Sequence, residues 1–458
     1  MPRFSSRARW VIASASLVVA PLMGGCNVKD ELLEPQNPGI IDPAATNSPA
    51  AAVGLRTGAL GQLKNRTAGG ESVWLFGGLL ADEWKSSDTF TQRNETDQRA
   101  IQTNNANVAG AYNNLQQTRG FTRTAIDKSL IYTPDSKGDI AEMYFTLGFE
   151  ELTLAENFCN GIPMSYTVDG IPIYGKPFTN DSIFKIAVTH FDSALTLSSG
   201  ADTKSVTVHQ AASVAKARTL VDLGQFAAAA PLVTAAIVPT NYQYTLTFDQ
   251  TTGDNGIWTQ NNSNARYTVS DSVDNITGQI PNATPFVSAK DPRVPTASPS
   301  SPKPFDAVTP LKTQQIWPGR SDPVPLVSGI DARLIEAEAH LQTGDFAGMM
   351  TILNALRTTS QTIGPLKVPA LPALATTPTT KDAAATLFFR EKAFWVFGRG
   401  QRLSDMRRLI RQYGRTQDQV FPIGAFHKGG NFGTDVNLPV PDAELTNPNF
   451  KGCLDRKA

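Results

Sequence analysis

The sequence predicts a mainly α-helical fold in which helix pairs are interrupted by one large, loop-rich insertion carrying short β-strands. Three observations predict it. The segments ARTLVDLGQFAAAAPLVTAAI and DARLIEAEAHLQTGDFAGMMTILNALR each contain two helical apolar patterns joined at a glycine, Gly224 and Gly344 respectively. Residues 239–327 are instead rich in Asn, Thr, Ser, Asp and Pro, with spaced aromatic residues that a disordered linker would lack.

Before the first helix pair, the chain shows a series of amphipathic patterns. A continuous apolar run over 73–81 is followed by the polar segment 85–107, which is expected to be a loop. A second loop, punctuated by Gly and Pro, is expected over 157–177. Apolar residues recur at helical spacing over 44–64, 108–130, 141–154 and 181–197.

The two helix pairs are expected over 210–237 and 330–357. They lie about 120 residues apart, so they do not form a tandem array but resemble tetratricopeptide-type helix hairpins separated by insertions. The charged and aromatic segment 382–412 follows a Pro-, Thr- and Ala-rich stretch and is expected to be helical throughout. The remaining residues, 413–458, read as loop.

The composition excludes several functional classes. The 458 residues carry 41 Lys and Arg against 41 Asp and Glu, and this neutral balance without a long basic run argues against nucleic acid as a partner. Four His and three Cys leave little material for a transition-metal site, so no metal or cofactor is expected. Hydrolase, metalloprotease, P-loop and dinucleotide motifs are absent, and the chain is therefore expected not to be an enzyme.

The first 26 residues have the pattern of an export signal. Arginines at positions 3, 7 and 9 precede a mainly apolar stretch from 10 to 20, which is shorter than the ~20 residues of a transmembrane helix. Small residues then precede Cys26, as in the lipobox of bacterial lipoproteins, where the thiol is acylated and the chain is cut before it. A plain secretory signal or an uncleaved anchor is the alternative interpretation.

Cleavage before Cys26 defines the expected organisation of the chain. Lipid on Cys26 would be its membrane attachment, and loss of the three arginines would leave 38 basic against 41 acidic residues, a net charge of −3. The polar, Pro- and Gly-containing residues 26–43 are expected to form a lipidated tether after the 1–25 signal peptide. The rest, 44–458, is expected to be one body, with a helical scaffold over 44–238 and 328–412, the insertion over 239–327 and a C-terminal loop region over 413–458.

The two cysteines that follow Cys26 could form a disulfide. Cys159 and Cys453 are an even pair in a chain bound for an oxidising compartment, where disulfides persist. Two separately buried thiols are the alternative. Sequence alone does not supply the Cα separation that decides between them.

Five motifs, in order along the chain, resemble the SusD/RagB family of outer-membrane nutrient-binding lipoproteins. Two positions depart from the family pattern: Gln401 stands where the family usually has His, and residues 159–163 read CNGIP in place of an aromatic-Gly-Asp-Val-Pro sequence. The motifs are KDE at 29–31 after the lipidated cysteine, DPR at 291–293, LIEAEA…GD…LNALR at 334–357, REKAFW…GQRLSDMRRL at 390–409, and VFPI…NPN at 420–449.

The resemblance implies a partner, a location and a ligand class. A family member would lie on the surface of the outer membrane, as a lid on a SusC-like TonB-dependent transporter, and capture glycan or another nutrient. Its helix pairs would face the transporter and its insertion loops the ligand. The charged motif residues have a structural interpretation of their own, because buried ion pairs between helices favour one specific packing. They are Glu391, Arg402, Asp405, Arg407 and Arg408.

Ligand-binding candidates follow from the chemistry of sugars. Sugar faces stack on aromatic rings, and polar side chains bond the hydroxyl groups, so a glycan site needs exposed aromatics in polar loops. Any single loop aromatic can instead belong to the core, and a cluster converging from both loop segments is the stronger prediction. The candidates are Trp84, Asp88, Phe90, Arg93 and Asn94 from the first segment, and Trp258, Asn261, Tyr267 and Trp317 from the insertion.

Two alternatives remain beside a nutrient-binding function. The first is a helical-repeat scaffold that binds only proteins at the outer membrane. The second is a lipid-anchored glycan hydrolase, which a pair of carboxyl groups ~5–10 Å apart in a cleft would indicate. The identity of the ligand does not follow from the sequence.

Overall fold

The computed structural model describes residues 47–168 and 171–458. The expected signal peptide, Cys26 and the tether lie outside the described residues. Within the described part of the chain, no helix has both the length and the apolar character needed to span a membrane. The described residues form one structural unit.

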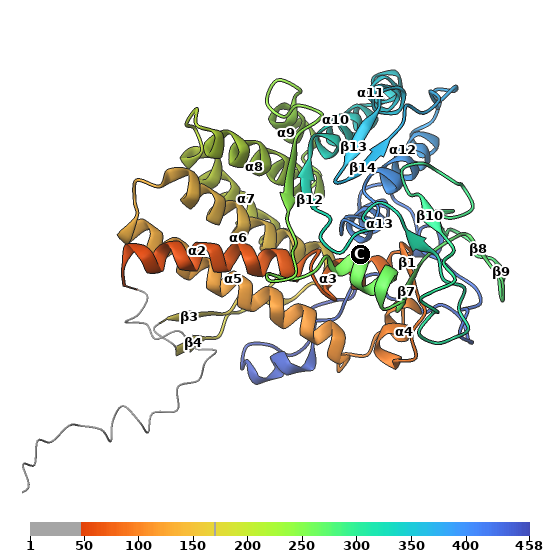
Figure 1. The fold of residues 1–458 in the computed structure, drawn as a ribbon, viewed down its shortest axis with the longest axis horizontal. Helices are drawn as coiled ribbons and strands as arrows, with labels where there is room; N and C mark the ends of the chain where they lie inside the picture. Colours follow the sequence, from red (N-terminus) through yellow and green to blue (C-terminus); the bar gives the residue numbers. More distant parts are fainter. Residues whose placement is uncertain (1–46, 169–170) are drawn as a thin grey trace, which may run out of the picture. The chain divides into compact units, whose positions relative to one another are not determined.

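Six helices from the first half of the chain form a stack in which neighbours in sequence pack side by side (Figure 1). Side-chain caps explain where several begin: the side chains of Ser48, Thr179 and Asp202 each accept a hydrogen bond from a backbone N–H of the first turn. The cap at Asp202 makes the following helix begin at Thr203, earlier than the expected position 210. The helices are α2 (Pro49–Arg66), α5 (Ala106–Tyr132), α6 (Lys137–Asn157), α7 (Asn180–Leu197) and α8 (Thr203–Asp222), with α3 (Val73–Leu80) beyond the end of α2.

The second helix pair has the expected form, and the first only in part. α10 (Gly329–Thr343) and α11 (Phe346–Thr358) pack together across Gly344, which has a φ of 81°. After α8, however, the expected second helix is only one α-helical turn, α9 (Phe226–Ala229), followed by a 3₁₀ turn, η2 (Ala230–Val233). Pro231 lacks the N–H that would continue the α-helix, and the chain turns extended at Thr234.

The expectation of one helix over 382–412 is wrong. The segment forms α12 (Lys381–Trp395) and α13 (Arg402–Arg411), separated by a turn. Gly398 and Gly400 in this turn both have a φ of 68°, a left-handed conformation that favours glycine. A side chain at Gly400 would also meet the ring of Trp74. The break allows α13 to pack against α3 and α6.

The strands form antiparallel two-stranded pairs. β6 (Gln243–Leu246) pairs with β12 (Val324–Ser328), so the two ends of the insertion meet where it leaves the helical scaffold. The first polar loop is more ordered than expected, because it contains β1 (Trp84–Ser86) and α4 (Thr91–Asp97). The other pairs are β1 with β7 (Tyr267–Val269), β2 (Ile162–Pro163) with β5 (Pro177–Phe178), β3 (Tyr166–Val168) with β4 (Ile171–Ile173), β8 (Val273–Asp274) with β9 (Gly278–Gln279), β10 (Thr296–Ala297) with β11 (Thr313–Gln314), and β13 (Gln361–Ile363) with β14 (Leu366–Val368).

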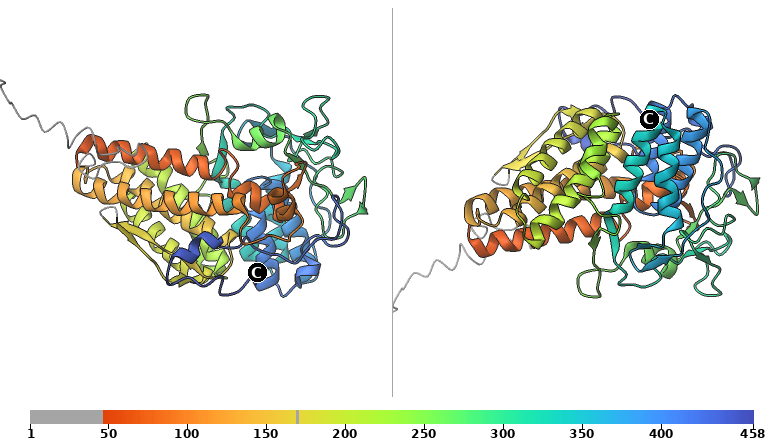
Figure 2. Two further views of the ribbon diagram at one scale, coloured as in Figure 1. Left: turned by 90° about the horizontal axis from the view of Figure 1, so that it is seen from below. Right: turned by 90° about the horizontal axis from the view of Figure 1, so that it is seen from above.

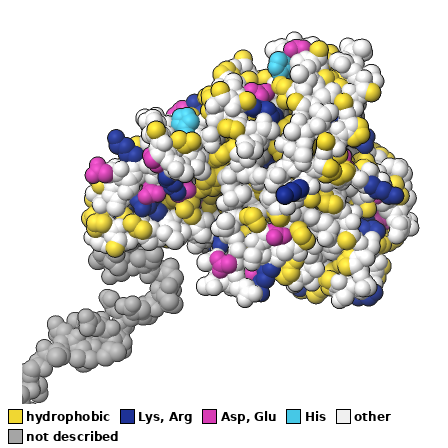
Figure 3. All heavy atoms as spheres, turned by 45° about the horizontal axis from the view of Figure 1, so that its top comes forward, with side chains coloured by type: hydrophobic (Ala, Val, Ile, Leu, Met, Phe, Trp, Pro, Cys, Tyr) yellow, Lys and Arg dark blue, Asp and Glu magenta, His cyan; other side chains and the backbone are white. Residues whose placement is uncertain are grey.

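The loop-rich insertion gathers on one side of the helices. Both views in Figure 2 place most of it beside the C-terminal helices, and away from the N-terminal end of α2. The insertion carries short strands and one π-helical turn, η3 (Trp258–Ser263). This confirms the expected fold class, a mainly α-helical body with a loop-rich insertion. On the face that Figure 3 shows, acidic and basic side chains are interspersed.

The charged motif residues hold the C-terminal helices together. Glu391 on α12 accepts hydrogen bonds from Arg293 in the insertion and Arg357 on α11, at 2.6 and 2.9 Å. Arg408 on α13 pairs with Glu338 on α10, and Asp405 pairs with Lys392 at 2.6 Å. The interpretation as buried ion pairs is confirmed for these residues. In contrast, Arg402 donates to the Thr284 hydroxyl, and Arg407 to the backbone carbonyls of residues 155 and 156.

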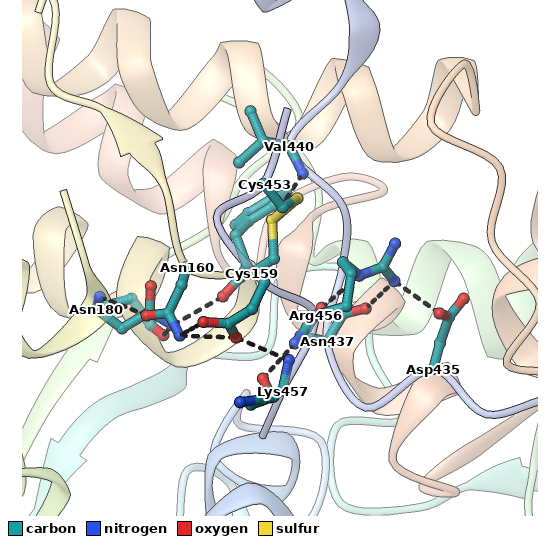
Figure 4. The surroundings of a disulfide bond; sticks show 12 residues. Cys159, Asn160, Asn180, Asp435, Asn437, Val440, Cys453, Arg456 and Lys457 are labelled. Carbon is teal, nitrogen blue, oxygen red and sulfur yellow. Dashed lines mark hydrogen bonds and ion pairs between the residues drawn. A yellow bond between two sulfur atoms is a disulfide. The ribbon is translucent and has the colours of Figure 1, made fainter. Parts of the chain in front are cut away.

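The disulfide attaches the C-terminal region to the end of α6 (Figure 4). Cys159 and Cys453 are bonded, with a Cα separation of 6.0 Å. The Asn160 amide also donates to Asp455 at 3.1 Å, and Arg456 pairs with Asp435 at 2.8 Å. The last residues of the chain are therefore bound to the body covalently and by polar contacts.

A buried carboxyl group between α3 and β1 makes stability depend on pH. Glu83 is fully buried, and its Oε1 accepts the Gly398 N–H at 2.9 Å, whereas Oε2 has no partner among the described residues. Burial raises the pKa of Glu83 from 4.5 to about 8. The folded state therefore binds a proton that the unfolded state releases, and the stability gained from it is lost as pH rises from 4.5 through 8.

We expect Glu83→Gln to become more stable relative to the wild-type protein as pH increases. The uncharged amide mimics the protonated carboxyl group, so the free energy of unfolding of the variant relative to wild type should rise by roughly 1 kcal/mol per pH unit between pH 6 and 8 and level off above pH 8. Urea unfolding at pH 6, 7 and 8.5 measures this difference. A difference independent of pH would show that Glu83 does not titrate in this range.

Candidate functional site

Three of the aromatic candidates are core residues. Trp84, Tyr267 and Trp317 are fully buried, so the expectation that they are exposed in loops is wrong. The pairing of β1 with β7 turns Trp84 inward, where its ring lies 4.9 Å from that of Phe397, measured between centroids. Trp317 packs against the same turn at Gly398. Rings covered in this way present no face to a ligand.

Two of the polar candidates organise the loops. Asn261 is fully buried, and its amide joins β7 to the segment of β11. It donates to the carbonyl oxygens of Tyr267 and Lys312 and accepts from the Gln314 N–H at 2.7 Å. Asn94 accepts a hydrogen bond from the Ser86 hydroxyl at 2.7 Å. The Asn261 amide is thereby committed to protein contacts, whereas Asn94 uses only its side-chain oxygen.

Phe90 is the exposed candidate, and the structure places a second phenylalanine beside it. Phe90, from the first polar segment, is 49% exposed, and Phe305, from the insertion, is 44% exposed. Their ring centroids are 6.2 Å apart and the ring planes are inclined by 38°. The guanidinium carbon of Arg266 lies 3.8 Å from the centroid of Phe305 and 5.2 Å from that of Phe90. We call Phe90, Phe305 and Arg266 the aromatic platform.

Backbone hydrogen bonds hold the segments of the aromatic platform together. Ser87 accepts the Asp306 N–H at 2.9 Å and donates its own N–H to the Arg266 carbonyl at 3.0 Å. The carbonyl of Ala265 accepts both the Phe305 N–H, at 3.0 Å, and the Ser87 hydroxyl, at 2.8 Å. Segments more than 170 residues apart in sequence are thus fixed in register directly below the two rings.

Ion pairs surround the aromatic platform and neutralise its cations. The buried Asp88 accepts hydrogen bonds from Arg266 at 2.6 Å, and it lies 3.2 Å from Arg93. Arg93 also pairs with Glu71. Lys428, from the C-terminal loop region, donates to the Asp88 carbonyl and to the Asp306 side chain. Asp88 therefore positions Arg266, and the guanidinium carbon of Arg93 lies 5.2 Å from the centroid of Phe90. Their role as ligand contacts stays a prediction.

The Asp306 carboxyl group at the platform is poorly suited to donate a proton. Burial alone would raise the pKa of Asp306, but hydrogen bonds from Lys428 and Thr309 lower it to about 2. Glycoside hydrolysis requires an acid with a raised pKa beside the scissile bond. Burial lowers the pKa of the neighbouring His427 to about 4, so this imidazole is neutral at pH 7. The arrangement can stack on a ring and donate hydrogen bonds, which is binding chemistry.

Trp258 lies apart from these contacts. It begins the π-helical turn η3, is partly exposed, and its backbone N–H donates to Asn255 at 3.1 Å. Its role as a ligand contact stays a prediction.

The sequence analysis missed Phe305, Arg266 and Lys428. Phe305 had a recognisable signal, because it stands between Pro304 and Asp306 in a polar loop, the same setting that singled out Phe90. Arg266 and Lys428 had no recognisable signal in the sequence. Their partners are distant in sequence, so only folding brings them together.

The fold is that of the SusD superfamily, as comparison with solved structures shows. A SusD superfamily protein from Bacteroides vulgatus matches with a TM-score of 0.60 and 14% identity, over 89% of this chain and 99% of that one. A SusD/RagB family protein from Bacteroides thetaiotaomicron matches with a TM-score of 0.59 and 12% identity, over 87% and 94%. A SusD-like carbohydrate binding protein from Bacteroides vulgatus matches with a TM-score of 0.61 and 11% identity, over 88% and 97%.

These likenesses confirm the expected SusD-like architecture. They compare the three-dimensional path of the backbone. At the level of sequence, no family model and no curated protein matches this chain. At 11–14% identity the comparison defines the fold, and the function must be argued from the residues of the site.

Proposed function

We propose that this protein binds glycan at the aromatic platform and is not an enzyme. The observation that carries the proposal is the convergence of Phe90 and Phe305, both about half exposed, beside the Arg266 guanidinium. Exposed phenylalanine faces attract the C–H groups of a sugar ring, while Arg266 can donate to its hydroxyl groups. A neighbour in fold is described as a SusD-like carbohydrate binding protein, which supports this ligand class.

The wider role extends the same proposal. The chain would be anchored in the outer membrane by lipid on Cys26, exposed at the cell surface, and would deliver its ligand to a SusC-like TonB-dependent transporter. The lipobox-like sequence before Cys26 and the SusD-like fold support this arrangement. The described helices would then face the transporter, and the insertion would face the ligand.

Substitution of the platform rings tests the proposal. Phe90→Ala and Phe305→Ala should each weaken binding of a recognised polysaccharide by about 1–2 kcal/mol, or five- to thirtyfold, because each removes a stacking face. Isothermal titration calorimetry against a panel of neutral and acidic polysaccharides measures the effect. Leu445→Ala is a matched control, since Leu445 is 54% exposed and lies outside the platform.

Two results would contradict the proposal. One is that no polysaccharide in the panel binds the wild-type chain. The other is that both phenylalanine variants bind as tightly as Leu445→Ala. Trp84→Ala is unsuitable as a binding test, because removing this buried ring destabilises the core by about 3–5 kcal/mol.

A further inference from the structure

A cavity lies among the stacked helices, separate from the aromatic platform. It has a volume of about 490 Å³ and is bounded by α5, α6, α7 and the segment that carries β3, β4 and β5. Small-molecule sites in proteins typically measure ~300–1,000 Å³. The cavity is therefore large enough for one or two sugar rings, and its lining shows which chemistry it would accept.

The floor of the cavity contains a buried donor and a buried acceptor that do not bond each other. The Arg119 and Glu151 side chains are 2% and 1% exposed, and Arg119 Nη1 lies 4.0 Å from Glu151 Oε1, beyond hydrogen-bond distance. The other polar atoms of these groups are occupied. Arg119 donates to Gln116 and to the Ser165 carbonyl, and Glu151 Oε2 pairs with His190 at 2.7 Å.

Arg119 Nη1 and Glu151 Oε1 are thus left without a hydrogen-bond partner in the described part of the chain. Both residues line the cavity, so a bridging group can reach these two atoms from it. A hydroxyl oxygen between them would accept from Nη1 and donate to Oε1, each at about 2.8 Å, since the 4.0 Å gap is shorter than two such bonds. A carboxylate cannot donate and an ammonium cannot accept, whereas a hydroxyl group does both.

The walls of the cavity are aromatic and its charge is balanced. Tyr144 and His190 stack on one side, with centroids 6.2 Å apart and planes inclined by 27°. Tyr166, which is 37% exposed, stands on the hairpin side with the Arg123 guanidinium 4.7 Å from its centroid. The cations Arg119 and Arg123 are matched by two carboxylates of the lining, those of Glu151 and Asp127. The cavity thus favours a neutral ligand.

We propose that this cavity is a second saccharide site, which binds one or two neutral sugar rings. Aromatic walls suit the C–H faces of such a ligand, and the Arg119–Glu151 gap suits one of its hydroxyl groups. The proposal does not depend on the aromatic platform, because the two sites share no residues.

The test isolates the cavity by disabling the platform. We would purify the full chain carrying Phe90→Ala and Phe305→Ala in a detergent without sugar head groups, and measure binding of maltose, cellobiose and lactose by saturation-transfer NMR. At least one disaccharide should bind. An added Glu151→Ala substitution removes the hydrogen-bond acceptor, and an added Tyr166→Ala substitution removes a wall. Each should weaken that binding about tenfold or more.

A matched control and a competing probe give the outcomes that would overturn the proposal. Ile171→Ala changes a residue that is 65% exposed on the same hairpin and outside the cavity lining, so it should leave binding unchanged. Absence of binding by all three disaccharides would overturn the proposal, as would equal binding by the Tyr166→Ala and Ile171→Ala chains. Binding of N-acetyltryptophanamide in place of the sugars would do the same, and would assign the cavity to an aromatic side chain of a protein partner.

Discussion

Asp331→Ala should destabilise the body by about 3–5 kcal/mol, because it leaves a buried arginine without its counter-charge. Asp331 accepts two hydrogen bonds from Arg399, at 3.0 and 2.6 Å, and Arg399 is 1% exposed. The carboxylate also accepts from Gln401 at 3.2 Å and from the Ser328 N–H at 2.7 Å, in the capping box that begins α10. One side chain thus caps a helix and fixes the turn between α12 and α13.

Urea unfolding at pH 7 measures this loss, and two variants calibrate it. Asp331→Asn keeps the shape of the side chain and part of its hydrogen bonding, so it should cost less than Asp331→Ala. Glu336→Ala removes a partly exposed partner of Arg333 on the same helix, an i,i+3 pair, and should cost less than about 1 kcal/mol. If Asp331→Ala cost no more than Glu336→Ala, the ion pair with Arg399 would not be important for the fold.

Removal of the disulfide should have the second large effect, a loss of about 2–5 kcal/mol. Cys159 and Cys453 are 294 residues apart, so the bond closes most of the described body into one loop. A crosslink across so long a loop strongly restricts the unfolded chain. The expected result is a lower unfolding temperature for Cys159→Ala/Cys453→Ala, and for wild type after reduction.

The reduced chain should also expose its C-terminal end. Without the bond, residues near 453 are held by Asn160–Asp455 and by Arg456, contacts at the surface that contribute little. Limited proteolysis should therefore cut the tail of the double variant faster than that of wild type. Alkylation without reductant is the direct check, since labelling of both cysteines in the native protein would contradict the bond.

The helical architecture could be predicted from sequence because its signals are local. Apolar periodicity located each long helix of the first half, and the glycine turn defined the pair formed by α10 and α11. Where the prediction failed, tertiary contacts had overridden the pattern. The charged segment 382–412 has helical periodicity throughout, yet it breaks at Gly398 and Gly400, because α13 must turn to pack against α3 and α6.

The candidate site could be predicted only in part, because exposure is a property of the folded chain. Trp84 and Phe90 both lie near the first polar loop, and sequence alone did not separate them. The pairing of β1 with β7 buries Trp84, whereas Phe90, at the N-terminal boundary of α4, projects beside Phe305. Polar loop composition therefore predicted the exposure of Phe90 correctly and that of Trp84, Tyr267 and Trp317 wrongly.

The sequence by itself determined the class of fold, the glycine turns of the helix hairpins, and the position of the loop-rich insertion, because periodicity and composition act over short stretches of chain. Only the tertiary structure decided which aromatics are free to bind. It joined Cys159 to Cys453, placed Phe305 and Arg266 beside Phe90, and left a gap of 4.0 Å between Arg119 Nη1 and Glu151 Oε1 in a cavity. Each of these outcomes depends on contacts between segments far apart in sequence, which no local pattern encodes.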